Sequence, residues 1–154
     1  MSFMYVTFIS LLIGGLMGFL QTLVRSGTIT LPWGIDYYQV LTVHGVILAL
    51  VLTTFFIIGF QFSLMGKTVG ISQKQRKVAW ISFWIMLIGT IITATMILLG
   101  KASVLYTFYA PLKAHPLFYI GLALVIVGTW FAEWLIFVSS MYGKKHIPDR
   151  SRHF

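Results

Sequence analysis

Long runs of apolar residues dominate the chain and set its expected elements. Four runs are long enough to be membrane-spanning helices, and they cover residues 3–24, 37–65, 78–99 and 117–142. The first three contain no charged residue, and the fourth contains only Glu133. About 20 mostly apolar residues suffice for a helix to cross the hydrocarbon core of a bilayer. Because backbone polar groups in lipid must be satisfied within the segment, the pattern predicts an all-α fold with four transmembrane helices.

The polar segments between the runs carry an asymmetric charge that predicts orientation. With four spans, the second connection and the C-terminal tail lie on the same side as the N-terminus. That side carries eight basic residues: Lys67, Lys74, Arg76, Lys77, Lys144, Lys145, Arg150 and Arg152. The other side carries three: Arg25, Lys101 and Lys113. Since basic residues gather in cytoplasmic loops, both termini of this multi-pass protein are expected in the cytoplasm.

Composition supports a membrane protein and excludes several other classes. Hydrophobic residues make up 58% of the 154 residues and charged residues 9%, and the mean hydropathy is +0.93. A soluble domain is about half apolar and about one quarter charged, so an ordinary soluble enzyme and a disordered chain are excluded. The net charge of +8 is scattered between apolar runs, so we expect no nucleic-acid partner. There are no cysteines, which excludes disulfides and thiolate metal sites.

His44 is the most informative polar residue, because it lies inside the second apolar run. Counted from Tyr37, it is roughly 10 Å below the outer interface. Ionisable residues at this depth face protein, a cavity or a cofactor, and a neutral imidazole is a standard haem iron ligand. Gly45 follows directly and would leave room beside the imidazole for the edge of a macrocycle. The residue pattern alone leaves two readings open: a haem ligand, or a histidine hydrogen-bonded to a neighbouring helix.

Glu133 is the second ionisable residue within a span, roughly 13 Å from the inner end of its helix. A carboxylate at this depth is a candidate proton relay. The alternative is a carboxylate paired with a neighbouring helix or leaning toward the cytoplasmic water. His44 and Glu133 each enter one of the alternative hypotheses given below.

The remaining histidines and basic residues give weaker signals. His115 is expected to be an interfacial loop residue, and His146 and His153 lie in the polar tail. No two of the four histidines share a helix face, so the chain predicts no multi-histidine metal site. The three outer basic residues, Arg25, Lys101 and Lys113, are expected to be solvated, with haem propionates as the alternative partners.

Gly14 and Gly18 form a GxxxG pattern in the first apolar run. Small residues at this spacing let two helix backbones approach closely. The pattern therefore predicts a tight helix crossing and carries no functional information by itself.

Two long stretches resemble subunit I of the haem–copper terminal oxidases, closest to the B-type branch. YYQVLTVHGVILALVLTTFFIIGF, residues 37–60, is similar to the second transmembrane helix of that subunit. VLYTFYAPLKAHPLFYIGL, residues 104–122, is similar to an outer loop and the start of the fourth helix. LQTLVRSG, residues 20–27, fits the end of the first helix. The resemblance covers almost the whole chain, and it implies the first four helices of a twelve-helix bundle.

The resemblance implies a respiratory enzyme that reduces oxygen to water and translocates protons. It makes His44 an axial ligand of the low-spin haem iron, with the second ligand in a helix beyond this chain. The high-spin haem and the copper ion belong to the complete subunit. Implied partners are the remainder of subunit I, oxidase subunit II, cytochrome c or quinol as electron donor, and the lipid bilayer of a bacterial or archaeal cell.

Residues 1–154 are accordingly expected to be one membrane domain and a fragment of a larger subunit, inactive as an oxidase by itself. Two other hypotheses stay open. One is a small four-helix proton-coupled transporter that uses Glu133. The other is a stand-alone cytochrome in which two chains each donate His44 to one haem.

Overall fold

The computed structural model describes residues 2–32, 34–68 and 70–143, and all of the named elements in this part of the chain are helices. The elements are α1 (Ser2–Arg25), α2 (Tyr37–Val46), the π-helix η1 (Ile47–Leu52), α3 (Thr53–Thr68), α4 (Gln73–Leu98) and α5 (Pro116–Gly143). Segments α2, η1 and α3 form one continuous helix, so the described part of the chain has four helices that are long and apolar enough to cross a membrane. The prediction of an all-α fold with four such helices is confirmed.

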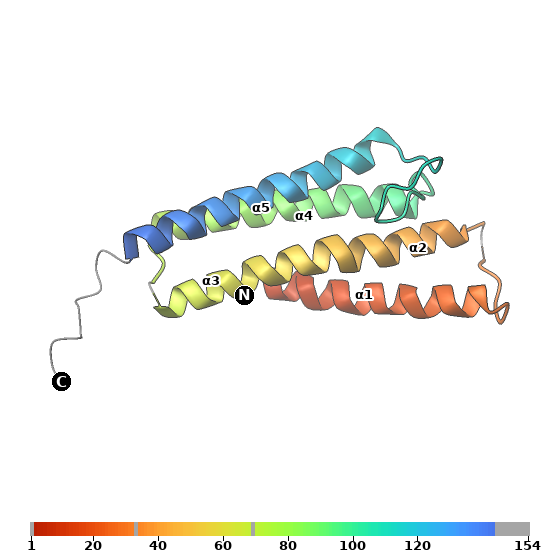
Figure 1. The fold of residues 1–154 in the computed structure, drawn as a ribbon, viewed down its shortest axis with the longest axis horizontal. Helices are drawn as coiled ribbons and strands as arrows, with labels where there is room; N and C mark the ends of the chain where they lie inside the picture. The colour runs from red at the N-terminus through yellow and green to blue at the C-terminus, as the bar shows by residue number, and fades with distance from the viewer. Residues whose placement is uncertain (1, 33, 69, 144–154) are drawn as a thin grey trace.

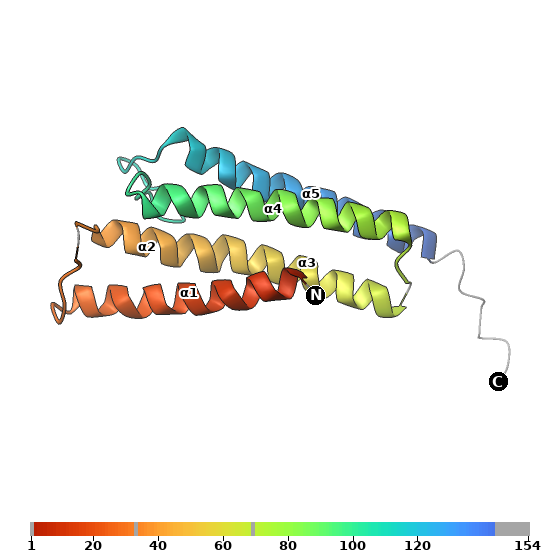
Figure 2. The ribbon, with the colours of Figure 1, turned by 180° about the vertical axis from the view of Figure 1, so that it is seen from behind.

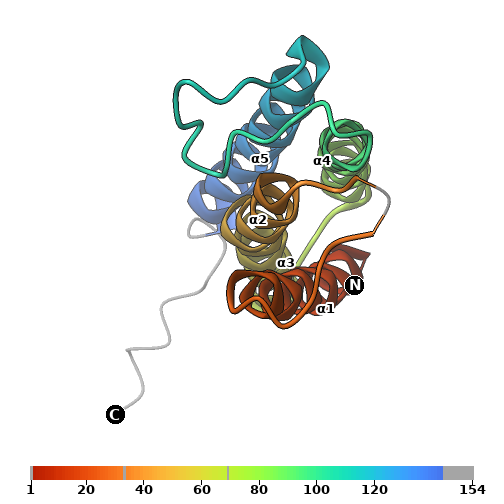
Figure 3. The same cartoon turned by 90° about the vertical axis from the view of Figure 1, so that its right-hand side faces the viewer.

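The four long helices lie side by side and alternate in direction (Figures 1 and 2). Viewed end-on, the α2–α3 helix lies between α1 on one side and the α4–α5 pair on the other (Figure 3). The α1–α2 and α4–α5 connections share one end of the bundle, and the α3–α4 connection lies at the other (Figure 1). Basic residues therefore lie at both ends of the bundle. One end carries Lys67, Lys74, Arg76 and Lys77, and the opposite end carries Arg25, Lys101 and Lys113. The basic residues of 144–154 lie outside the described residues.

Helix α4 begins five residues before the predicted span, because a capping box starts it within the polar connection. The Gln75 backbone N–H donates to Ser72 Oγ at 3.3 Å, and the Ser72 N–H donates to Gln75 Oε1 at 2.8 Å. This reciprocal pairing satisfies two otherwise unpaired helix N–H groups. The polar residues of the cap are not part of the apolar run. The hydropathy pattern therefore predicts that the helix begins at the run rather than at the cap.

The apolar run suggested a uniform α-helix around His44, but the structure shows an interruption. Residues Ile47–Leu52 form a π-helix, which begins three residues after His44. A π segment adds a residue to the turn, so the three- and four-residue spacing used to assign helix faces does not carry through it. Such segments occur frequently at functional sites.

Helices α4 and α5 form the tightest pair, and glycines make this possible. A Cβ atom on Gly89 would lie 2.5 Å from the Gly121 carbonyl oxygen and 2.9 Å from the Val125 backbone nitrogen. A Cβ on Gly128 would lie 3.1 Å from the Met86 backbone nitrogen. Apolar burial drives helices together only weakly in lipid, so close packing through small residues contributes more to association. The sequence pattern does not reveal this seam, because its glycines come from two helices and form no local motif.

Two buried apolar clusters complete the packing. The cluster toward the α4–α5 loop consists of Val43, Val46, Met96, Ile97, Ala102, Val104, Phe118 and Leu122. The second consists of Phe3, Val51, Phe55, Ile58, Phe83, Met86 and Ala132. Together they hold the central helix against both of its neighbours, and this fixes which way His44 faces.

Candidate functional site

His44 lies on α2, is half-buried, and faces α1. Its Nδ1 atom is 2.8 Å from the Gly14 carbonyl oxygen. A carbonyl oxygen only accepts hydrogen bonds, so Nδ1 must donate and carries a proton. In the tautomer of imidazole with its single proton on Nδ1, Nε2 holds the free lone pair, and this is the form that binds a metal. The two readings left open by the sequence are therefore compatible, because the bond to α1 uses one nitrogen and leaves the other.

His44 packs against the surface of α1 at Gly14 and Gly18. A Cβ atom on Gly18 would lie 2.6 Å from Cε1 and 2.7 Å from Nδ1 of His44. A Cβ on Gly14 would clash with the Leu48 side chain. The predicted close helix crossing at Gly14 and Gly18 is confirmed. The GxxxG pattern predicted packing alone, whereas the crossing also positions the imidazole.

The loop between α4 and α5 covers the other side of α2 near His44. Thr42 Oγ1 accepts a hydrogen bond from the Leu105 N–H at 3.0 Å. The Gln39 side chain donates to the carbonyl oxygens of Ile97 at 2.6 Å and Leu98 at 3.2 Å, which satisfies the end of α4. The Thr42 contact holds the loop, and the Gln39 contacts hold the end of α4, against the helix turns that precede His44.

Tyr106 of this loop takes the space beside Gly45. A Cβ atom on Gly45 would lie 2.8 Å from Cδ1 of the Tyr106 ring. The prediction that Gly45 leaves room for the edge of a macrocycle is therefore wrong. The glycine instead allows a loop residue to pack against α2, a contact between distant segments that no local pattern announces.

Gln21 adds an unpaired polar atom to the α1 face that holds Gly14 and Gly18. Its Oε1 atom is buried and has no hydrogen-bond partner among the described residues. Gln21 follows Gly14 by seven residues and Gly18 by three, which places the three residues on one helix face. A buried unpaired carbonyl costs about 1–3 kcal/mol.

Glu133 lies on α5, is half-buried, and pairs with a neighbouring helix. The Gln61 amide of α3, oriented with its nitrogen toward the carboxylate, donates to Oε1 at 3.0 Å and to Oε2 at 3.3 Å. Gln61 follows His44 by 17 residues on one continuous helix, which is about 25 Å along its axis. Glu133 and His44 therefore belong to separate sites. An interhelical partner for Glu133 was one of the two predicted alternatives, and the structure identifies this partner as Gln61.

The remaining predicted residues have local roles or lie outside the described part. His115 Nδ1 accepts a hydrogen bond from the Leu117 N–H at 3.2 Å, so His115 caps the start of α5. Arg25, Lys101 and Lys113 are exposed at the end of the bundle that is nearer to His44 (Figure 1). His146 and His153 lie outside the described residues. Within residues 2–32, 34–68 and 70–143, no group of three or more potential metal ligands occurs.

Four long apolar helices, with an oriented histidine and a paired carboxylate inside the spans, define a polytopic helical membrane protein. The profile of one family, described as Cytochrome C and Quinol oxidase polypeptide I, matches residues 1–150. The chain belongs to this oxidase subunit I family, as its resemblance to subunit I predicted.

Two similar proteins support this assignment. The chain is 33% identical over 142 residues to cytochrome c oxidase subunit 1 of Thermus thermophilus, and the match covers 87% of this chain and 25% of the relative. A solved cryo-EM structure of a heme-copper terminal oxidase dimer matches with a TM-score of 0.83 and 35% identity. That match covers 97% of this chain and 27% of the solved chain. The chain thus spans about a quarter of the length of these proteins.

Proposed function

We propose that this chain supplies one axial ligand, His44, to a low-spin haem within a respiratory terminal oxidase subunit I. The observation that carries the proposal is the hydrogen bond from His44 Nδ1 to the Gly14 carbonyl oxygen at 2.8 Å. It fixes the tautomer and orients the ring, as partners of metal-bound histidines generally do. When bound, the haem would supply one-electron transfer toward the site of oxygen reduction.

The residues present fit one half of a low-spin haem site. Nε2 of His44 is available as a ligand, and Gly18 lets the ring lie close to α1. The proposal assigns the second axial ligand, the high-spin haem and the copper ion to the remainder of subunit I. We propose that the chain alone is inactive as an oxidase, because a low-spin haem ligand does not reduce oxygen without that second centre.

The wider assembly follows from the same proposal. Its expected partners are oxidase subunit II and cytochrome c or quinol as electron donor, and the complete enzyme would couple oxygen reduction to proton translocation. The proposed location is a bacterial or archaeal cell membrane, within the B-type branch of the family. The excess of basic residues in the second connection and the C-terminal tail of the sequence supports an orientation with both termini in the cytoplasm.

The test is the substitution His44→Ala in a complete subunit that contains this segment. Loss of the axial ligand is expected to abolish the low-spin haem absorbance in the reduced-minus-oxidised spectrum. His115→Ala is the matched control, since it removes a histidine at the same end of the bundle and should leave the spectrum intact. An unchanged low-spin signal in His44→Ala would refute the assignment.

We also propose Glu133 as a proton-relay residue, supported by its position within a span and its contact with Gln61. Membership of the oxidase family favours a role within an oxidase over a separate four-helix transporter. In an otherwise active assembly, Glu133→Gln should slow proton uptake, because the amide keeps the shape of the side chain and removes its titration. Unchanged proton uptake would dispose of the relay, and Glu133-dependent substrate flux without haem would favour the transporter.

A further inference from the structure

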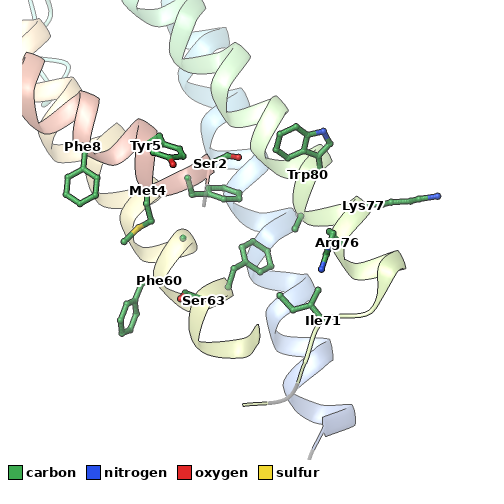
Figure 4. Close-up of a pocket in the computed structure, with 14 residues that line it drawn as sticks. Ser2, Met4, Tyr5, Phe8, Phe60, Ser63, Ile71, Arg76, Lys77 and Trp80 are labelled. Carbon is green, nitrogen blue, oxygen red and sulfur yellow. The ribbon is translucent and has the colours of Figure 1, made fainter. Parts of the chain in front are cut away.

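A groove on the far end of the bundle from the α4–α5 loop has no role in the proposed haem site. It lies between the start of α1, the middle of α3 and the first turns of α4, and has a volume of about 850 Å³ (Figure 4). Most of its lining is apolar and aromatic: Phe3, Phe8, Phe60, Phe62, Ile71 and Trp80. A volume of this size falls within the range of roughly 300–1,000 Å³ that is typical of ligand sites.

One rim of the groove is basic. Arg76 and Lys77 both line it, and Figure 4 shows Arg76 turned toward the part lined by Ser63 and Ile71, whereas Lys77 extends away. No carboxylate occurs among the lining residues in the described part of the chain. Lys67 and Lys74, which are exposed, add further positive charge at this end. Arg76 therefore offers its guanidinium to an anion.

The order of side chains along α4 matches the layers of a membrane surface. Arg76 lies in the first turns of α4, and Trp80 follows one turn later, with half of its surface exposed. Basic residues favour the headgroup layer, and tryptophan favours the boundary between headgroups and acyl chains. The aromatic lining then continues toward the hydrocarbon region along α1 and α3.

We propose that this groove binds an anionic phospholipid, with the phosphate at Arg76 and an acyl chain along the aromatic lining. The charge of the rim selects an anionic headgroup over a zwitterionic one, and the apolar lining requires a chain rather than a free anion. Basic pockets between transmembrane helices on the cytoplasmic side bind such headgroups. The site is independent of His44, so it stands or falls separately from the haem proposal.

Native mass spectrometry of the delipidated full chain in detergent tests the proposal. The probes are phosphatidylglycerol, phosphatidylcholine and inorganic phosphate, added in separate titrations. One phosphatidylglycerol molecule should bind in preference to phosphatidylcholine, and inorganic phosphate should not be retained. Arg76→Gln should weaken phosphatidylglycerol binding about five-fold, whereas Lys101→Gln, which removes one charge at the opposite end, should leave it unchanged.

A second variant tests the acyl-chain part of the site. Ala79→Phe places a ring in the groove and should weaken binding of both lipids, and Ser63→Leu does the same from α3 if Ala79→Phe fails to fold. Equal losses in Arg76→Gln and Lys101→Gln would overturn the proposal, as would lipid binding that survives both groove-filling variants. Two further results would overturn the proposal. One is retention of inorganic phosphate at Arg76, and the other is loss of the lipid because another helix occupies the groove in a complete oxidase.

Discussion

His44 and Gly14 are joined by a hydrogen bond of 2.8 Å that crosses from the central helix to α1. The bond ties the proposed metal ligand to the backbone of a helix 30 residues earlier in the chain. Because the acceptor is a backbone carbonyl, a substitution at Gly14 does not remove it, and only a change of His44 itself removes the donor. The distance between the two helices, which depends on Gly18, is the feature that mutation can change.

Gly18→Ala is expected to displace the His44 ring. The new Cβ would lie 2.6 Å from Cε1, so the imidazole must move or the helices must separate. Overpacking of this kind costs about 1–3 kcal/mol. In a complete subunit the low-spin haem absorbance should shift or decrease, and the thermal unfolding midpoint of the chain should fall.

Gly15→Ala is the matched control for this prediction, because nothing lies within 4 Å of its Cβ position. The same change on the same helix should leave both the spectrum and the unfolding midpoint nearly unchanged. If the two variants behave alike, the contact between Gly18 and His44 does not position the ring.

The sequence predicted the helices well, because their signal is local. An uncharged run of about 20 residues is sufficient evidence for a transmembrane helix, and His44 stands out as a polar residue inside such a run. Contacts between distant segments were not predictable in the same way. The Tyr106 ring beside Gly45, the Gln61 amide beside Glu133 and the α4–α5 glycine seam each depend on which helix faces lie together, and hydropathy contains no information about that.

Gly89→Ala is expected to separate α4 from α5. The added methyl group would meet the backbone of α5, at 2.5 Å from the Gly121 carbonyl oxygen, and a backbone cannot rotate away as a side chain can. We expect a loss of about 1–3 kcal/mol in unfolding free energy, measured by denaturant titration in detergent. Gly66→Ala is the control, since its nearest neighbour is the end of the Ile71 side chain at 3.5 Å; equal losses would contradict the seam.

Gln39→Leu is expected to loosen the loop that covers α2. The substitution removes two hydrogen bonds to the last carbonyl groups of α4, at 2.6 Å and 3.2 Å. The Ile97 carbonyl keeps the Gly100 N–H as a donor at 2.9 Å, whereas the Leu98 carbonyl loses its side-chain donor. The cost is about 1–3 kcal/mol, and amide hydrogen exchange across residues 99–115 should become faster. Gln73→Leu makes the same change at an exposed position of α4 and should not alter exchange in the loop. Unchanged exchange in Gln39→Leu would show that the apolar contacts of the loop hold it without the cap.

Gln61 and Glu133 are expected to be energetically coupled across α3 and α5. Gln61→Leu removes the donor and leaves a half-buried carboxylate without its partner, so the variant should lose about 1–3 kcal/mol of stability. In the double variant Gln61→Leu with Glu133→Leu, both polar groups are absent and no carboxylate is left unpaired. The double variant should therefore be less destabilised than the sum of the two single changes. Additive losses, measured by denaturant titration of all four proteins, would mean that the amide and the carboxylate do not interact, and Glu133 would then need another partner within the membrane.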